Sequence, residues 1–350
     1  MKNEQERFTV HKRVALTISR GTKAGSTNLW VKLQADGIEG WGEASPFSTG
    51  AQTQTTEQIE HDLQRLASAL VHYHPLQRQA IEGVVTEMDV VSAARAAVDV
   101  ALHDWLGKHV GLPLWHLWGL DLSRIGPTAV TVGISSPADA VDRLKKWCAQ
   151  QQVASVKVKL GAPAGIDADK AMFEALLAHI PPGAKVSIDA NGGWNLNDSL
   201  EMAHWLSARG VVYLEQPLSV ADDGLLPELF ARSPLPIFID ESCFTSADIH
   251  RLAHCVHGVN IKLMKAGGLS EVQRMIHTAS ACGLQVMFGC YSDSAISNTA
   301  LAHLSSLAHH LDLDSHFNLK DDPFTGAQLK DGALIPNHRP GLGLSRHAEA

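Results

Sequence analysis

The chain has 350 residues, of which 45% are hydrophobic and 19% are charged, a composition typical of a folded globular protein rather than a disordered chain. Its formal net charge of −8 has the wrong sign for a nucleic-acid-binding protein. No apolar run reaches the roughly 18 residues that a membrane span requires. At roughly 150 residues per domain, this length predicts about two domains.

The cysteines and the N-terminus bear on the cellular compartment. The five cysteines are odd in number and scattered, and no two form a CxxC pair, which argues against a disulfide framework or a zinc site. The first ten residues, MKNEQERFTV, contain no apolar signal segment. We therefore expect a cytoplasmic protein.

The first 120 residues or so predict a small sheet followed by helices. From about Thr56 to Leu106 the apolar spacing becomes helical, and Ala93–Gly107 predicts a buried helix that ends at a glycine cap. Before this helical part, the residues alternate as in strands over 8–16 and 29–33, and a Gly/Ser/Thr-rich loop over 19–27 is predicted between them. A turn is predicted over 40–46.

From about residue 126, short β-branched runs alternate with amphipathic helical stretches such as 138–149 and 270–281. This alternation predicts a parallel sheet, and eight units predict a closed (β/α) barrel, with an open doubly wound sheet as the alternative. No GxGxxG or Walker motif follows any run, which disfavours the open nucleotide-binding sheet. The eight runs are 128–134, 155–160, 185–190, 211–215, 237–240, 259–264, 285–290 and 310–314.

Lysines occupy the predicted inner face of two of these runs. In 156–160, two valines and a leucine alternate with Lys157 and Lys159, so both lysines point into the barrel. Lys262 has the same parity in the sixth run, whereas Lys265 has the opposite one and is the poorer candidate. Runs two and six lie four strands apart, so Lys159 and Lys262 should face each other across the mouth.

Three successive runs end in acids. Asp189, Glu215 and Asp240 lie 26 and 25 residues apart, and one such acid alone would more often cap the following helix. Because neighbouring strands lie about 5 Å apart, the three carboxylates can converge on one cation. Oxygen ligands without His or Cys favour Mg²⁺, with Mn²⁺ as a substitute. In the eighth run, Asp312 and Asp314 share one face.

These motifs resemble the muconate-lactonizing subgroup of the enolase superfamily. The matching segments, in order, are Lys-Val-Lys, Asp-Ala-Asn-Gly-Gly-Trp, Glu-Gln-Pro, Asp-Glu-Ser and Asn-Ile-Lys-Leu-Met-Lys-Ala-Gly-Gly. Gly40–Pro46 and Ala97–Lys108 resemble its capping domain, and Asp312-Leu-Asp314 resembles the dipeptide epimerases, including the L-Ala-D/L-Glu epimerases. After the seventh run, Tyr291 and Asp293 stand where those epimerases usually have Met and Glu.

The resemblance implies a (β/α)7β-type TIM barrel with an α+β capping domain. We expect the cap over 1–122, the barrel over 123–317, and a C-terminal segment over 318–350 that returns to the cap. The expected partners are a small dipeptide substrate and further copies of the chain in a homo-oligomer, with neither nucleic acid nor membrane.

The resemblance also assigns roles to individual residues. Asp189, Glu215 and Asp240 would bind one Mg²⁺ per subunit, and Lys159 and Lys262 would be the acid/base catalysts. The residues that would contact substrate are Lys157, which also supports the first catalyst, Thr131, Cys290, Asp312 and Asp314, and the residues behind the metal ligands would be Asn191 and Glu241.

A Mg²⁺-assisted abstraction of the proton next to a carboxylate follows from these roles. Two lysines on opposite sides of one carbon allow removal on one side and return on the other, which is epimerization, and Lys157 would lower the pKa of its neighbour by repulsion. The alternatives are cycloisomerization or o-succinylbenzoate synthase-type β-elimination through the same enediolate, a Schiff-base aldolase, and a non-catalytic scaffold.

The predicted loop at 19–27 would act as a mobile lid over the site. In the L-Ala-D/L-Glu epimerases this loop supplies a cation to the substrate's glutamate side chain, and Lys23 falls at that place. The resemblance therefore implies a preference for Glu or Asp at the C-terminal position of the dipeptide, while a solvated loop lysine is the alternative.

Overall fold

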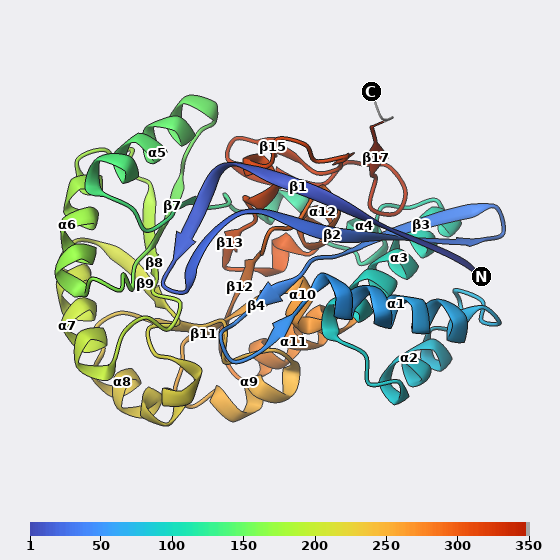
Figure 1. The fold of residues 1–350 in the computed structure, drawn as a ribbon, viewed down its shortest axis with the longest axis horizontal. Helices are drawn as coiled ribbons and strands as arrows, with labels where there is room; N and C mark the ends of the chain where they lie inside the picture. The colour runs from blue at the N-terminus through green and yellow to red at the C-terminus, as the bar shows by residue number, and fades with distance from the viewer. Residues whose placement is uncertain (348–350) are drawn as a thin grey trace.

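The computed structural model describes residues 1–347, and its centre is a barrel of eight parallel strands (Figure 1). Neighbours along the chain are also neighbours in the sheet, which runs in the order β13-β12-β11-β10-β9-β8-β7-β6. A parallel bridge between Thr128 and Leu311 joins the first strand to the last, so the open sheet is excluded. The strands are β6 (Val130–Val132), β7 (Ser155–Lys159), β8 (Lys185–Asp189), β9 (Val211–Glu215), β10 (Ile237–Ile239), β11 (Gly258–Lys262), β12 (Gln285–Gly289) and β13 (His310–Asp312).

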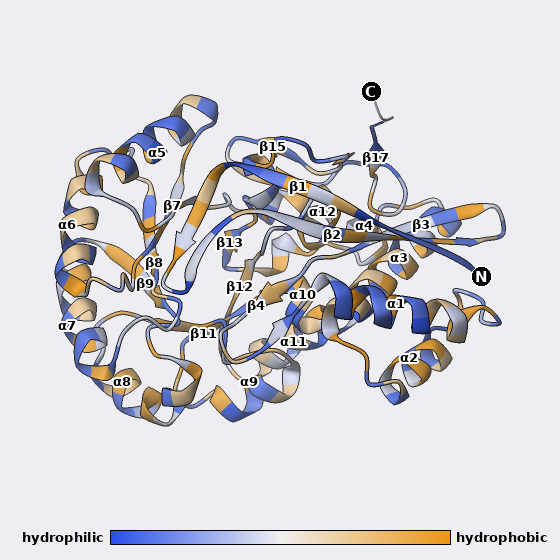
Figure 2. Cartoon of the chain, viewed as in Figure 1, coloured by the Kyte–Doolittle hydropathy of each residue, from blue (hydrophilic) through white to orange (hydrophobic). Residues whose placement is uncertain are grey.

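A helix follows each of the first seven strands, and between the eighth strand and residue 347 there is none of that length, which confirms the (β/α)7β barrel. These helices pack outside the sheet and carry hydrophobic and hydrophilic residues on different faces (Figure 2). They are α5 (Pro137–Gln150), α6 (Ile166–Leu177), α7 (Leu196–Ser207), α8 (Leu226–Arg232), α9 (Ser246–Leu252), α11 (Leu269–Ala281) preceded by the single turn α10 (Leu263–Ala266), and α12 (Ala295–Ala302).

An α+β unit lies against one side of the barrel. Its antiparallel sheet consists of β1 (Lys2–Ile18), β2 (Gly21–Ala35) and β3 (Ile38–Ala44), in that order. The short pair β4 (Phe47–Ser48) and β5 (Thr53–Gln54) leads to α1 (Thr56–Leu70), α2 (Arg78–Glu87), α3 (Ser92–Val110) and α4 (Leu114–Leu117). Thr55 and Gln58 form a capping box at the start of α1, which satisfies two backbone N–H groups there.

The predicted loop over 19–27 is wrong. It is part of a long β-hairpin in which only Ser19 and Arg20 form the turn, and its end reaches over the barrel mouth (Figure 1). The Gly, Ser and Thr residues pair across the two strands, and the hydroxyls of Thr17 and Thr22 hydrogen-bond at 2.8 Å. The composition of 19–27 alone could not predict these strands, because the segment becomes a strand by hydrogen bonding to its partner strand.

The turn predicted over 40–46 is also wrong, because β3 covers most of it. A side chain at Gly42 would lie 1.9 Å from the carbonyl oxygen of Ala97, so the glycine permits close packing of β3 on α3 instead of a turn. Similarly, α3 runs past Gly107 and ends at Gly111, whose φ of 74° provides the left-handed cap.

The chain after the barrel packs against the α+β unit. Phe324 contacts the rings of Phe8 and Trp41 at centroid distances of 6.1 and 5.6 Å. As far as residue 347, this part of the chain contains four short strands, β14 (Phe324–Thr325), β15 (Gln328–Lys330), β16 (Ala333–Ile335) and β17 (Ser345–Arg346). Within residues 1–347, none of the helices combines the length and the hydropathy of a membrane span.

Candidate active site

A cavity of about 270 Å³ lies between the β1–β2 hairpin and the carboxyl ends of the barrel strands. Both Lys159, at the end of β7, and Lys262, at the end of β11, line it. Because β7 and β11 are four strands apart in an eight-stranded barrel, the two lysines enter the cavity from opposite sides, as their spacing predicts. Apolar side chains from the hairpin, Leu16 and Ile18, form part of the opposite wall.

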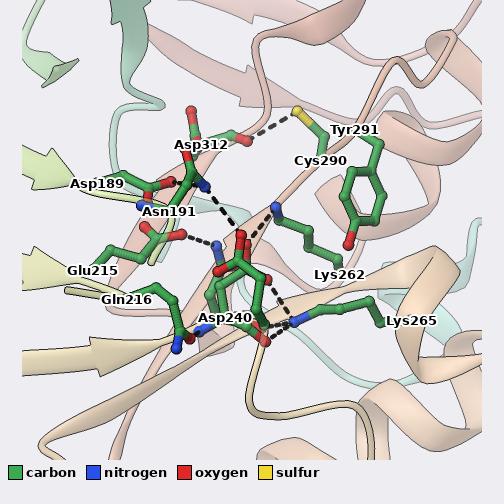
Figure 3. A network of polar contacts seen from close by, with 12 residues as sticks. Asp189, Asn191, Glu215, Gln216, Asp240, Lys262, Lys265, Cys290, Tyr291 and Asp312 are labelled. Carbon is green, nitrogen blue, oxygen red and sulfur yellow. Dashed lines mark hydrogen bonds and ion pairs between the residues drawn. The ribbon is translucent and has the colours of Figure 1, made fainter. Parts of the chain in front are cut away.

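The three strand-end acids are buried and each binds a lysine. Asp189 Oδ2 lies 2.5 Å from Lys159 Nζ, and Asp240 Oδ2 lies 2.7 Å from Lys262 Nζ (Figure 3). Burial alone would lower the pKa of Lys262, but the Asp240 charge outweighs burial and holds that pKa well above its ordinary value. Glu215 pairs with a third lysine, Lys157, at 2.6 Å.

Lys157 is completely buried and lies below the cavity rather than in its wall. Its Nζ also lies 2.7 Å from Asp312 Oδ2, so it joins the acids of β9 and β13. Burial disfavours the ammonium, yet Asp312 and Glu215 raise the pKa of Lys157 well above its ordinary value. Its contact with substrate, and its effect on the neighbouring Lys159, stay predictions.

The three acids have the right chemistry for a divalent cation. Asp189 and Glu215 are register partners on adjacent strands, and Asp240 follows the next strand. Burial and the charge of Asp189 raise the pKa of Glu215 to about 7, a repulsion that a bound cation would relieve. Among residues 1–347, however, no three His, Cys, Asp or Glu side chains lie close enough together to hold an ion. Instead, each of the three carboxylates pairs with one or two lysines.

Two buried amides hold the acids from behind. Asn191 donates to Asp189 Oδ2 and to Glu241 Oε1, both at 3.1 Å, and Gln216 Oε1 accepts from the Asp240 N–H at 2.9 Å. Both Asn191 and Gln216 have positive φ, at 44° and 37°. This backbone strain at two successive strand ends is typical of functional sites. The structure therefore places Asn191 and Glu241 next to the acids, and their role behind a metal ion stays a prediction.

The acidic pair of β13 lies beside Thr131 of β6. Asp314 accepts a hydrogen bond from the Thr131 N–H at 2.8 Å, and Asp312 accepts one from its hydroxyl at 3.2 Å. Burial and the charge of Asp312 raise the pKa of Asp314 to about 6. Cys290, at the end of β12, donates its S–H to the Asp312 carbonyl at 3.2 Å. All four residues predicted here are brought together.

Lys23 lines the main cavity from β2, although the lid loop on which it was expected is a strand. Burial and the charge of Arg20 lower its pKa. Arg20, at the hairpin turn, pairs with Glu241 at 2.8 Å and donates to the Asn191 carbonyl at 2.7 Å. The hairpin is thus attached to the residues behind the metal-ligand candidates.

Sequence reasoning missed Arg20 and dismissed Lys265. Lys265 is buried, its Nζ lies 2.5 Å from Asp240 Oδ1, and it donates to the Cys243 carbonyl at 2.8 Å. Strand parity misplaced it because β11 ends at Lys262 and the chain continues as a helical turn. No pattern in the sequence could have identified Arg20, whose partners lie more than 170 residues away.

The two departures from the epimerase pattern connect the barrel to the cap. Tyr291 stacks on Phe47 with ring centroids 4.7 Å apart, and its ring lies 4.4 Å from Lys262 Nζ. Asp293 accepts hydrogen bonds from the Ser45 hydroxyl and from the Tyr291 N–H. Tyr291 thus forms the wall beside one catalytic candidate (Figure 3).

Two family models match the chain: the enolase C-terminal domain-like model over residues 139–350 and the mandelate racemase / muconate lactonizing enzyme N-terminal domain over residues 4–119. Two curated relatives named hydrophobic dipeptide epimerase come from Flavobacteria bacterium (strain MS024-2A) and Roseobacter litoralis. They are 41% and 42% identical to this chain and cover 98% of it, with 97% and 98% of their own lengths aligned.

A solved structure of similar fold is the dipeptide epimerase of Enterococcus faecalis V583 in complex with Mg and the dipeptide L-Leu-L-Tyr. It superposes with a TM-score of 0.91 at 27% sequence identity, and the alignment covers 98% of this chain and 99% of the other. The alignments with these relatives thus cover both the α+β unit and the barrel.

Proposed function

Because the chain belongs to the mandelate racemase / muconate lactonizing enzyme family of the enolase superfamily, we propose that it is a metal-dependent dipeptide epimerase. It would invert the α-carbon of the C-terminal residue of a dipeptide by two-base proton transfer. The relatives that match nearly its full length carry the name of that activity. The observation that carries the proposal is the placement of Lys159 and Lys262 on opposite sides of one cavity.

In this scheme one lysine, as the neutral amine, removes the α-proton, and the other, as the ammonium, gives a proton to the opposite face. Lys159 and Lys262 each have one carboxylate partner, at 2.5 and 2.7 Å, so each amino group is held at a fixed position at the cavity. The hairpin forms one wall of the cavity, and any water that it displaces would strengthen the electrostatic interactions inside.

Asp189, Glu215 and Asp240 would hold one Mg²⁺, with Mn²⁺ as a substitute. When bound, the cation supplies the positive charge that neutralises the substrate carboxylate as its α-proton leaves. Lys265 would then hold Asp240 in place through the contacts described above, and Asn191 would do the same for Asp189. Asp312 and Asp314 would bind the α-ammonium of the dipeptide.

Deuterium uptake at the α-carbon tests the proposal. The purified chain with Mg²⁺ in D₂O is expected to introduce deuterium at the C-terminal α-carbon of L,L-dipeptides and to produce the L,D-epimer, both measured by mass spectrometry and chiral chromatography. A panel from which no dipeptide takes up deuterium would reject the activity. Turnover of a carboxylate without an ammonium, as cycloisomerization or β-elimination requires, would favour that alternative.

We predict that Asp314→Asn raises KM for free dipeptides far more than for N-acetylated analogues, because only the free ammonium needs the carboxylate. Removing one partner of a buried charge pair costs roughly 3–5 kcal/mol. Since the pKa of Asp314 is raised to about 6, its anionic form is lost as the pH falls through about 6, and KM for free dipeptides should rise there. Equal KM values for free and acetylated substrates in the parent enzyme would contradict the assignment.

We predict a second effect at Lys23. If it binds an acidic C-terminal side chain, the ratio of kcat/KM for L-Ala-L-Glu to that for L-Ala-L-Lys should fall by about tenfold to a hundredfold in Lys23→Glu. L-Ala-L-Leu belongs in the same assay, because the relatives are named for hydrophobic dipeptides. A parent that prefers the lysyl or leucyl substrate removes Lys23 from this role.

We also propose a cytoplasmic homo-oligomer. All five cysteines are free in the structure, which fits a reducing compartment. Light scattering coupled to size-exclusion chromatography would measure the number of subunits, and a monomer would contradict this proposal.

A further inference from the structure

A small cavity of about 50 Å³ adjoins the main cavity at the end of β13. Thr131, Asp312 and Asp314 line it, together with three cations: the catalytic candidate Lys159, Lys12 of β1 and Arg143 of α5. Lys23 lines only the main cavity, whereas Lys12 lines both. Lys12 is therefore the hairpin cation next to the acids that would bind the substrate's α-ammonium.

The backbone of β1 turns Lys12 towards this cavity. The pairing of β1 with β2 is interrupted between His11 and Leu16, and bulges of this kind redirect side chains. Over the gap, Lys12 pairs with Leu319 of the returning C-terminal segment, and the Val14 N–H donates to the Asn318 side chain at 3.1 Å. The strand is thus fixed on both sides of the lysine.

Lys159 already pairs with Asp189, whereas neither Lys12 nor Arg143 has an anionic partner among residues 1–347. Lys12 is 7% exposed and forms no ion pair there, although a buried ammonium is costly unless it is paired. Arg143 likewise forms none, and its guanidinium stacks over the Trp147 ring at 4.2 Å. Trp147 in turn donates to the Thr131 carbonyl at 2.9 Å, which ties Arg143 to the same strand end.

We propose that Lys12, with Arg143 beside it, selects dipeptides whose N-terminal residue is Asp or Glu. This rests on the proposed function, because the α-ammonium must first lie against Asp312 and Asp314. In Asp or Glu the side-chain carboxylate is only a few bonds from that ammonium, so a cation at the edge of the same cavity can bind it. Lys12 would then acquire in the complex the anion that it lacks in the free protein.

The test compares dipeptides that differ only in charge at the N-terminal position: L-Glu-X, L-Gln-X and L-Lys-X, where X is the better accepted of Leu and Glu. In the parent, kcat/KM for L-Glu-X should exceed that for the isosteric L-Gln-X by about tenfold to a hundredfold. The difference should lie in KM rather than in kcat. Lys12→Gln should remove this preference, and Lys12→Glu should shift it towards L-Lys-X.

The matched control is Arg13→Gln, which removes the same charge from the next residue of β1, an exposed one. It should leave the Glu-to-Gln ratio unchanged. If Lys12 only offsets the charge of the neighbouring acids, its removal would affect all substrates equally and the ratio would stay as in the parent, which overturns the proposal.

A parent ratio near one, or a preference for L-Lys-X, also overturns it, and this result requires no variant to fold. Arg143→Gln provides a second variant, which should lower the ratio in the same direction. The proposed epimerase activity survives these negative results, because it fails only if no dipeptide takes up deuterium.

Discussion

Lys159→Ala and Lys262→Ala are each expected to reduce net epimerization by about a hundredfold to ten-thousandfold, the usual contribution of a positioned acid or base. Each lysine is the proton-transferring candidate on its own side of the cavity, so the loss of either interrupts the two-step transfer. Each variant should still exchange the α-proton of one epimer with D₂O, and the two variants should retain opposite epimers. Proton NMR of the α-position with both pure epimers measures this directly.

Lys146→Ala, at an exposed position of α5, is the matched control and should retain parental rates. Because Lys159 and Lys262 neutralise buried carboxylates, each alanine variant also needs a thermal unfolding curve in Mg²⁺ to establish that it is folded. If folded variants both racemize the substrate at undiminished rates, the two-base assignment is wrong.

Removal of divalent metal by EDTA is expected to abolish activity, and Mg²⁺ should restore it. Asp240→Asn should weaken metal binding by at least the 10- to 100-fold that outer-sphere changes alone produce. The stabilization that Mg²⁺ gives to the folded chain follows the ratio of its concentration to its Kd, and reaches about 2.7 kcal/mol at one hundred times Kd. The Mg²⁺-dependent increase in Tm therefore measures the effect without any substrate.

Asp198→Asn provides a control outside the barrel mouth, because Asp198 lies at the start of α7, where its side chain accepts from Asn195. It should show the same Mg²⁺-dependent increase in Tm as the parent. Full turnover in metal-free buffer, or an unchanged increase in Tm for Asp240→Asn, would reject the metal site.

The sequence was sufficient for the barrel but not for the cap. In the barrel, alternation within five-residue strands sets which side chains face inward, and helices separate the strands, so Lys159, Asp189 and Lys262 could be placed by counting. In the hairpin, the order arises from cross-strand pairing and from contacts with residues far away in the chain, such as that of Arg20 with Glu241. Local composition at 19–27 therefore suggested a loop.

The sequence also could not predict the contacts of Lys265, whose position in the sixth run has the opposite parity to that of Lys262. Lys265 reaches Asp240 because the chain leaves β11 as a helical turn, which rotates the side chain by an amount that strand counting does not contain. The pairing of the acids with the lysines, in which Glu215 and Asp312 share Lys157, also depends on side-chain rotamers. The pattern of residues at the strand ends therefore predicts which side chains lie close together, but not which of them form ion pairs.

The cavity is lined partly by the hairpin and partly by the barrel, and this affects how the protein can change during evolution. Lys12, Leu16, Ile18 and Lys23 all lie on the β1–β2 hairpin. All of them except the buried Lys12 are at least partly exposed, so substitutions at Leu16, Ile18 and Lys23 can alter the cavity wall at small cost to stability. The barrel acids and lysines form a buried network in which a single change leaves an uncompensated charge. New substrate specificities should therefore arise through substitutions in the hairpin, while the acids and lysines of the barrel stay unchanged.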